Sequence, residues 1–230
     1  MNRPFFQDLL QATEPDRQQL ISLPIIQSAL RGEIEKTQYV AFLTEAFHHV
    51  RHTVPLLMAC GSRLDDRHHA LRAAVVEYIE EEAGHEEWIL ADIAACGGNP
   101  DAVRLSAPHA STEVMVAYAY HQIDRQNPVG FFGMVHVLEG TSVALATHAA
   151  GAIQQSLQLP DAAFTYLTSH GSLDQEHVRF FENLMNALTD PDDKAAVIHC
   201  AGRIYSLYGE IFRTLPGRVS TSCTKEPVHA

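Results

Sequence analysis

The segment 129–157, VGFFGMVHVLEGTSVALATHAAGAIQQSL, is apolar around almost its whole circumference when it is drawn as a helix. A helix without a polar face is buried by its neighbours, so this segment is expected in the interior of the fold. Glu139 is its only carboxylate. Burying an unpaired carboxylate costs on the order of several kcal/mol, so Glu139 is expected to be paired or to bind a cation. Gly133 and Gly140 would allow another helix or a ligand to come close to the same segment.

The rest of the chain also has helical periodicity, with caps and helix breakers at its boundaries. No segment alternates polar and apolar residues as a strand does, and no repeat or linker separates two cores. The prediction is an all-α fold, a single bundle of about seven helices in residues 1–216, followed by a mobile C-terminal tail at 217–230. The other expected helices lie in 4–32 with a break at Pro24, in 37–61, from 63 to just before Gly97, and in 111–126, 161–184 and 190–215.

The composition disfavours several classes of partner. The 230 residues carry a net charge of −12, which speaks against nucleic acid or anionic lipid. No apolar run approaches the roughly 18 residues of a membrane span, and the start MNRPFFQDLLQATEPD has acids where a signal peptide has its apolar core. The four cysteines are scattered, without a CxxC pair. We expect a cytoplasmic protein that acts on a small-molecule substrate, with neither nucleic acid nor membrane as a partner.

Three potential metal ligands occur at helical spacing in the segment 161–184. His170, Asp174 and His177 stand at i, i+4 and i+7, so in one helix all three would leave a single face within two turns. Imidazole and carboxylate together suit a first-row transition metal, iron or manganese as readily as zinc. Because the chain has 14 histidines, the same pattern could also be a solvated stripe or a hydrogen-bonded pair in the core. The spacing indicates a metal site and leaves that alternative open.

A second carboxylate and imidazole lie at Glu82 and His85, inside the acidic run EEEAGHEE. In a continuous helix these two side chains are about 60° apart on one face. An acidic run is most often a solvated face, and taken alone this one would be interpreted so. Asp174 and His177 repeat the spacing, however, and helical di-metal proteins use this unit from each of two helices together with single glutamates from others. The repetition favours a site that combines Glu82, His85 and Glu139 with the histidine and aspartate triplet.

A substrate pocket is expected beside these residues. Apolar side chains at Phe131, Phe132 and Phe180 favour an amphipathic or aromatic small molecule, such as an amino acid or a fatty acid, and Arg179 or His48 would meet a carboxylate. A change at His49 is expected to matter little. The residues predicted to form the pocket are His48, His52, Phe131, Phe132 and Arg179.

With these residues, positions 20–215 resemble the heme-oxygenase-like helical superfamily that includes the TENA/THI-4-like thiaminase II and pyrroloquinoline-quinone (PQQ) synthase. Within it, the chain is most similar to the branch of non-heme diiron oxidases and oxygenases. The resemblance rests on Glu82 and His85, on Glu139 in its apolar helix, and on the triplet of residues 170, 174 and 177. It implies a heme-oxygenase-like helical bundle, a metal-binding oxidoreductase, and a homodimer as a possible assembly.

The resemblance also implies roles for these residues. Glu82 and His85 would serve one iron, the triplet mainly the other, and Glu139 would bridge or complete the pair. In some relatives the first carboxylate stands seven residues before its histidine, where this chain has Tyr78, so the choice between Glu82 and Glu81 stays open. Two Fe(II)/Fe(III) ions, with O2 as co-substrate, would oxidise a small organic acid, an amine or an amino-acid-like substrate.

Three other functions stay open. A thiaminase-II-like hydrolase needs a nucleophilic thiol near the interior helices, and no cysteine occurs between Cys96 and Cys200. A cofactor-free oxidase resembling quinone synthase would bind an anionic aromatic substrate with His, Tyr and Arg side chains, and has no use for converging carboxylates. In a non-catalytic small-molecule-binding protein, a metal would be structural or absent. Metal stoichiometry separates these classes.

Overall fold

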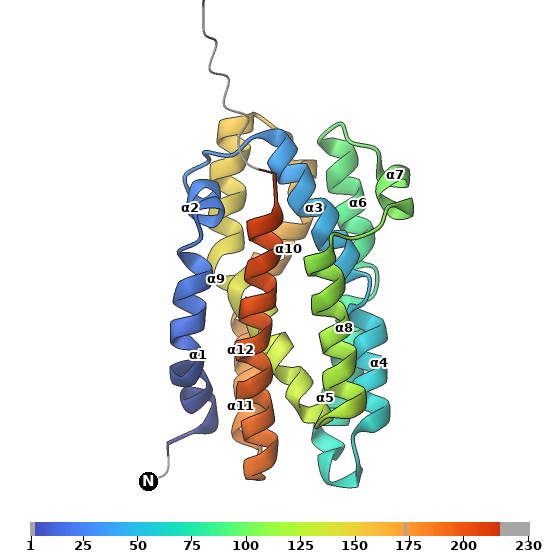
Figure 1. Cartoon of the computed structure of the whole chain (residues 1–230), viewed down its shortest axis with the longest axis vertical. Helices are drawn as coiled ribbons and strands as arrows, with labels where there is room; N and C mark the ends of the chain where they lie inside the picture. Colours follow the sequence, from blue (N-terminus) through green and yellow to red (C-terminus); the bar gives the residue numbers. More distant parts are fainter. Residues whose placement is uncertain (1–2, 173, 217–230) are drawn as a thin grey trace, which may run out of the picture.

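The computed structural model describes residues 3–172 and 174–216, and within them all side chains except those of 143–144 and 170–177. Every described element is helical, which confirms the all-α class, and Figure 1 shows the longer helices side by side along the molecule. The predicted tail 217–230 lies outside the described residues. The α-helices are α1 Phe5–Ile21, α2 Pro24–Leu30, α3 Lys36–Val50, α4 Thr53–Arg63, α5 His69–Glu82, α6 His85–Ala95, α7 Pro100–Leu105, α8 Ala110–Arg125, α9 Phe132–Leu157, α10 Thr165–Ser172, α11 Asp174–Asn186 and α12 Pro191–Thr214. Short 3-10 helices occur at η1 Asp66–His68, η2 Pro128–Phe131 and η3 Asp161–Ala163.

The expectation of about seven helices is wrong, because several segments expected as single helices are interrupted within the described residues. The segment 37–61 divides into α3 and α4 at Arg51 and His52. Pro55 accounts for this break: it has no N–H for the carbonyl of Arg51, four residues earlier, and its ring would clash with that carbonyl in a continuous helix.

The segment expected as one helix from residue 63 divides as well. It forms η1, α5 and α6, and the last two are separated by Ala83 and Gly84. Gly84 has a φ of 94°, a left-handed conformation that glycine adopts without a clash at Cβ. Glu82 therefore ends one helix and His85 begins the next. The two residues are brought together by the turn at Gly84 and not, as expected, by lying on one face of a continuous helix.

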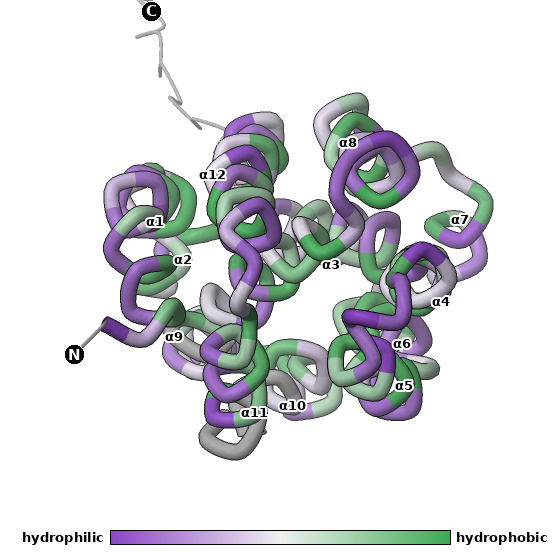
Figure 2. The backbone as a smooth tube through the Cα atoms, turned by 90° about the horizontal axis from the view of Figure 1, so that it is seen from below, coloured by the Kyte–Doolittle hydropathy of each residue, from purple (hydrophilic) through white to green (hydrophobic). Residues whose placement is uncertain are grey.

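Two buried apolar clusters fill the bundle, and α9 contributes to both. Phe132 and Val137 in its first half belong to one cluster, and Ala150 and Ile153 in its second half belong to the other. Seen along the bundle, hydrophobic parts of several helices face its middle (Figure 2). Glu139 stands between the two halves of α9, so a carboxylate is placed where the two clusters meet.

The two halves of α9 meet at an angle. The segment Pro128–Ser142, which consists of η2 and the first part of α9, is inclined by 41° to the segment Leu145–Leu157 at the end of α9. No single helix in the described part of the chain is long and apolar enough to cross a membrane. The two segments of this bent pair reach the necessary length and apolar composition only when they are taken together.

The helices α9 and α12 approach each other closely at Gly133. A Cβ built on Gly133 would lie 2.4 Å from the carbonyl oxygen of Val197 and 2.6 Å from the amide nitrogen of Ala201, both in the backbone of α12. The predicted close approach of another helix is therefore found at Gly133. At Gly140, in contrast, a Cβ would meet nothing within 4 Å.

Gly133→Ala is expected to lower the free energy of unfolding by about 3 kcal/mol, because the backbone of α12 has to move away from the new methyl group. For a chain of this size, that corresponds to a fall in Tm of roughly 6–12 °C. The matched control is Gly151→Ala in the same helix, where a Cβ would meet nothing within 4 Å. That change should raise the stability by about 0.5–1 kcal/mol. Equal Tm shifts for the two variants would contradict the close approach at Gly133.

Candidate metal centre

Glu82 and Glu139 line one cavity of about 70 Å³ inside the bundle. Its described walls come from α3, α4, α5, η2, α9, α10 and α12. Most of the lining is apolar, from side chains such as Leu56, Leu57 and Met134. The side chains with polar atoms that matter for the chemistry below are His49, Tyr78, Glu82, Glu139, Tyr166 and Tyr208.

Glu139 is electrostatically the most unusual residue of this cavity. Burial raises the pKa of its carboxyl well above the usual value, and the nearby carboxylates of Glu82 and Glu81 raise it further. The side chain keeps some accessible surface because it faces the cavity. Two acids of α5 thus disfavour the ionised form of a buried acid of α9, and a bound cation would relieve that effect.

Glu82 and His85 form a direct pair across the turn at Gly84. The Nδ1 atom of His85 lies 3.0 Å from Oε2 of Glu82. His85 is buried, and its ring stacks on Trp88 with 4.0 Å between ring centres. Since a carboxylate only accepts hydrogen bonds, Nδ1 carries the proton and Nε2 has the lone pair in the neutral ring, the arrangement in which a carboxylate orients a metal-binding histidine. Glu82 lines the cavity, whereas Glu81 is near enough to act on Glu139 without lining it.

Tyr78 places a polar atom without a described partner at the cavity. Its side chain is 2% exposed and lines the cavity, and its hydroxyl has no hydrogen-bond partner among the described residues. Leaving a buried hydroxyl unsatisfied costs about 1–3 kcal/mol. A ligand or a coordinated group in the cavity would supply the missing partner, so the residues present fit a bound metal with its own oxygen ligands.

His49, which the sequence interpretation set aside, lies in the wall of this cavity. It is buried, its Nδ1 atom lies 3.0 Å from the carbonyl oxygen of Glu45, and its ring meets that of Tyr208 edge-on at 5.9 Å. A carbonyl only accepts, so Nδ1–H donates to it, and Nε2 has the lone pair of the neutral ring. One signal for this placement was present: His49 follows the apolar Ala46 by three residues, a spacing that puts both on one side of the helix, and Ala46 is buried.

The residues predicted to form the substrate pocket are dispersed. Phe131 lines the cavity, and Phe132 is completely buried in the core. The Nε2 atom of His48 lies 2.9 Å from the hydroxyl of Ser106, and His52 lies against Tyr120. Neither histidine is among the described residues that line the cavity. Arg179 is exposed on α11; the remaining residue named for apolar lining, Phe180, packs against Tyr78 with 5.7 Å between ring centres.

The triplet is carried by the helices α10 and α11, and its three side chains lie outside the described ones. His170 belongs to α10, Asp174 and His177 belong to α11, and residue 173 between these helices is not described. Among the described side chains, no group of three or more His, Cys, Asp or Glu is placed to hold a metal ion. The described candidates are Glu82, Glu139 and His49, which line the cavity, and His85, which contacts Glu82, and they do not form a complete metal site by themselves.

A buried aspartate fixes α10 beside the cavity. Asp92 of α6 is fully buried, and its two carboxylate oxygens accept the backbone N–H groups of Thr165 and Tyr166 at 3.0 and 2.9 Å. These are N–H groups of the first turn of α10, which have no partner within the helix. Burial raises the pKa of Asp92, and these hydrogen bonds oppose that effect. Asp92 thus sets the position of Tyr166, which lines the cavity one turn before His170.

Solved structures share this fold. A domain of unknown function from Shewanella denitrificans, described as having a heme oxygenase-like fold, has a TM-score of 0.82 and 24% identity, covering 94% of this chain and 93% of that one. A TenA homologue from Pseudomonas syringae has a TM-score of 0.78 and 10% identity, covering 91% of both chains. Heme oxygenase-1 from Synechocystis, solved in complex with heme, has a TM-score of 0.72 and 12% identity, covering 92% of this chain and 91% of that one. The predicted heme-oxygenase-like fold is confirmed.

The sequence comparisons bear on the family. No curated protein sequence matches the chain. A family model described as iron-containing redox enzyme matches residues 40–209, which is the larger part of the 230 residues and includes most of α3 and the whole of α5, α6, α9, α10 and α11. The chain belongs to this family of iron-containing redox enzymes.

Proposed function

We propose that this protein is a non-heme iron oxidase or oxygenase that binds two iron ions at the cavity of Glu82 and Glu139 and uses O2 to oxidise a small organic substrate. The observation that carries the proposal is that Glu82 and Glu139 line one cavity with mainly apolar walls and that Glu81 lies near enough to act on Glu139. Like charges in such a setting are costly without a cation. Divalent metal ions would remove that cost, and membership of the family favours iron.

Two histidines would complete the described part of the ligand set. The Nδ1 atoms of His49 and His85 each lie 3.0 Å from an oxygen that accepts their proton, the carbonyl of Glu45 and the carboxylate of Glu82. Each ring is therefore held in the tautomer whose Nε2 atom can bind a metal. The proposal adds His49 to the ligands expected from the sequence.

The remaining ligands would come from α10 and α11. His170 follows Tyr166 by four residues, and His177 precedes Phe180 by three. Tyr166 lines the cavity, and Phe180 packs against Tyr78, which lines it too. Because residues three or four apart share one side of a helix, this register supports His170 and His177, together with Asp174, as ligands.

Bound iron would supply the activation of O2. The chain supplies the setting: Glu82 and Glu139 balance the charge of the metal, and Leu56, Leu57 and the other apolar walls keep bulk water out. Burial and the neighbouring carboxylates raise the pKa of Tyr78, so its hydroxyl stays protonated and acts as a hydrogen-bond donor towards groups that enter the cavity.

The rival functions have less support. Cys60, Cys96 and Cys200 are buried, none of them is among the described residues of the cavity wall, and burial raises the pKa of Cys60 and Cys200 to about 12. A thiaminase-like hydrolase would need a reactive thiolate, which these values disfavour. Heme is disfavoured as well, because the carboxylates of the cavity would oppose a porphyrin that carries two carboxylates of its own.

The proposal is tested by loading the metal-free protein with Fe(II) under anaerobic conditions, measuring bound iron after gel filtration, and then admitting O2. We expect two irons per chain and a transient visible absorption band that depends on O2. Binding of a single zinc in preference to iron, or no metal uptake by the folded protein, would refute the proposed function. Circular dichroism of the same samples verifies that the helices are intact.

A further inference from the structure

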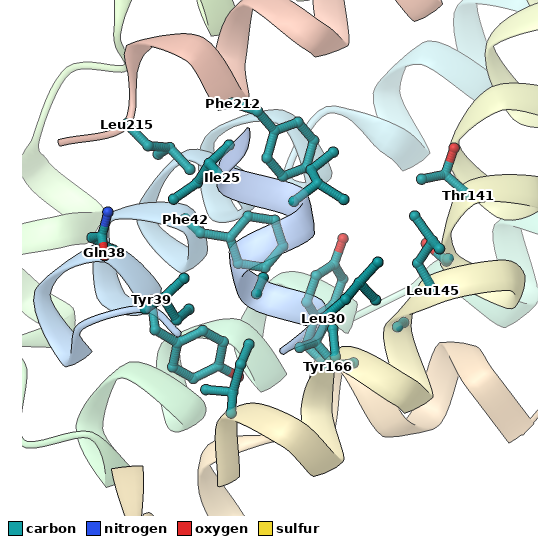
Figure 3. A pocket seen from close by; sticks show the side chains of 18 of the residues that line it. Ile25, Leu30, Gln38, Tyr39, Phe42, Thr141, Leu145, Tyr166, Phe212 and Leu215 are labelled. Carbon is teal, nitrogen blue, oxygen red and sulfur yellow. The ribbon is translucent and has the colours of Figure 1, made fainter. Parts of the chain in front are cut away.

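A second cavity, of about 100 Å³, shares lining residues with the cavity of Glu82 and Glu139. Figure 3 shows the side chains of this second cavity. It is enclosed by α2, α3, α9, α10 and α12. Ser142, Tyr166 and Tyr208 line both this cavity and that of Glu82 and Glu139. The two cavities therefore share one wall, made by these three residues.

The polar groups of the larger cavity are distributed unevenly. Thr141 and the three shared residues are on the side of the metal centre, since Thr141 adjoins Ser142 in α9. Figure 3 shows Gln38 and Tyr39 on the side away from Thr141. Apart from Gln38, Tyr39, Thr141 and Tyr166, the labelled wall is apolar and consists of Ile25, Leu30, Phe42, Leu145, Phe212 and Leu215.

The polar groups on the far side are already engaged. The amide of Gln38 donates to the carbonyl of Pro216 at 2.8 Å and accepts the backbone N–H of Glu35 at 2.9 Å. The hydroxyl of Tyr39 donates to the carbonyl of Ala163 at 2.8 Å. A ligand that reaches this side of the cavity therefore meets apolar surface, and a polar group at its far end would lose its hydration without compensation.

The aromatic rings of the wall pack on one another. Phe42 lies between Tyr39 and Phe212, with ring centres 6.4 and 5.8 Å apart and interplanar angles of 20° and 17°. Tyr39 also stacks on Phe164 at 5.1 Å. Apart from these rings, most of the wall is aliphatic, with side chains such as Ile25, Leu30 and Leu145. An alkyl chain can contact this aliphatic surface along its whole length.

From this arrangement we infer that the larger cavity binds the unbranched alkyl tail of the substrate, while the polar head group of the substrate lies at the carboxylate cavity. The inference names the substrate class of the proposed enzyme, and only the head-group part rests on the proposed function. One water-sized group needs about 10–15 Å³ on this volume scale, so the cavity holds a tail of roughly seven to ten such groups. Amino-acid-like substrates with a polar far end are excluded by the same reasoning.

The test measures the affinity of n-alkanoates, from hexanoate to hexadecanoate, and of the matching n-alkanols by calorimetry, with iron-free and with iron-loaded protein. Affinity should rise about fourfold for each added methylene until the tail fills the cavity, and then level off. Decanedioate, which carries a second carboxylate, should bind roughly a hundredfold or more weaker than decanoate. An affinity that does not change with chain length, or equal affinities for decanoate and decanedioate, would overturn the inference.

A variant in the wall locates the binding site. Ala149 of α9 lines the cavity, so Ala149→Leu should move the plateau to alkanoates shorter by about two methylenes. Thr147→Leu, an exposed site in the same helix, is the control and should leave the plateau in place. An unchanged plateau in folded Ala149→Leu would place the tail elsewhere and refute the inference.

The two forms of the protein separate this inference from the proposed function. A dependence on chain length in both forms, with alkanoate preferred over alkanol only after iron is loaded, supports both. If the chain-length dependence is present but no iron binds, the tail site stands and the proposed iron chemistry fails. If iron binds and chain length has no effect on affinity, the proposed iron chemistry stands and the tail site is refuted.

Discussion

Replacing Glu139 with Gln is expected to abolish binding of iron and, at the same time, to make the iron-free protein more stable. Glutamine keeps the size of the side chain and removes a charge that burial and the carboxylates of Glu82 and Glu81 disfavour. We expect the free energy of unfolding of the iron-free protein to rise by about 1–2 kcal/mol, since burial and the two neighbouring carboxylates disfavour the ionised form of Glu139 and a neutral amide avoids that cost. This corresponds to a gain of roughly 2–8 °C in Tm.

Opposite changes in stability and metal binding distinguish a ligand from a structural residue. Bound iron is measured by a colorimetric chelator after anaerobic loading, and Tm is measured before loading. Glu80→Gln is the control, because Glu80 is an exposed acid of α5, two residues from Glu82. It should leave both quantities nearly unchanged. A Glu139→Gln protein that keeps full iron occupancy, or that unfolds at a lower temperature without iron, would show that Glu139 is not held in place for a cation.

Local signals in the sequence were sufficient for much of the fold. Pro24 is the first residue of α2. Asp190 stands directly before Pro191, the first residue of α12, and caps this helix by accepting the backbone N–H of Asp192. Caps and breakers act within a few residues, so they can be recognised without knowing the tertiary structure. The apolar segment was placed correctly for its first half, because a helix with no polar face has few alternatives to burial.

The breaks within helices were harder to predict, because each depends on a balance between local strain and packing. Gly84 follows an acidic run that is a good helix former, and the choice of a left-handed turn there also depends on where α6 packs. The role of Asp92 could not be predicted at all. Its partners, Thr165 and Tyr166, are more than 70 positions away in the chain. Nothing within a few residues of Asp92 indicates that they are near it.

The histidines of α3 show the limit of periodicity at the candidate site. Residues 46–50 are all buried, because α3 is packed against α6 on one side and α8 on another. When consecutive residues are all buried, an apolar stripe no longer indicates which of them faces a particular cavity. The contacts decide instead: His48 meets Ser106, and His49 meets Tyr208 at the carboxylate cavity.

His49→Ala is therefore expected to weaken iron binding by about a hundredfold, and His48→Ala should leave it nearly unchanged. The two residues form a matched pair: they are neighbours in α3, each is 3% exposed, and each substitution removes a hydrogen bond of the ring, so both variants lose packing and some stability. Of the two, only His49 lines the cavity, and its Nδ1–H donates to the carbonyl of Glu45, which places the lone pair of the neutral ring on Nε2. Affinity for Fe(II) is measured by competition with a chelator. Added imidazole should restore part of this affinity in His49→Ala, because the removed side-chain ring leaves room for a free imidazole. Equal losses in the two variants, without rescue by imidazole, would mean that His49 acts only through packing and that the ligand set excludes it.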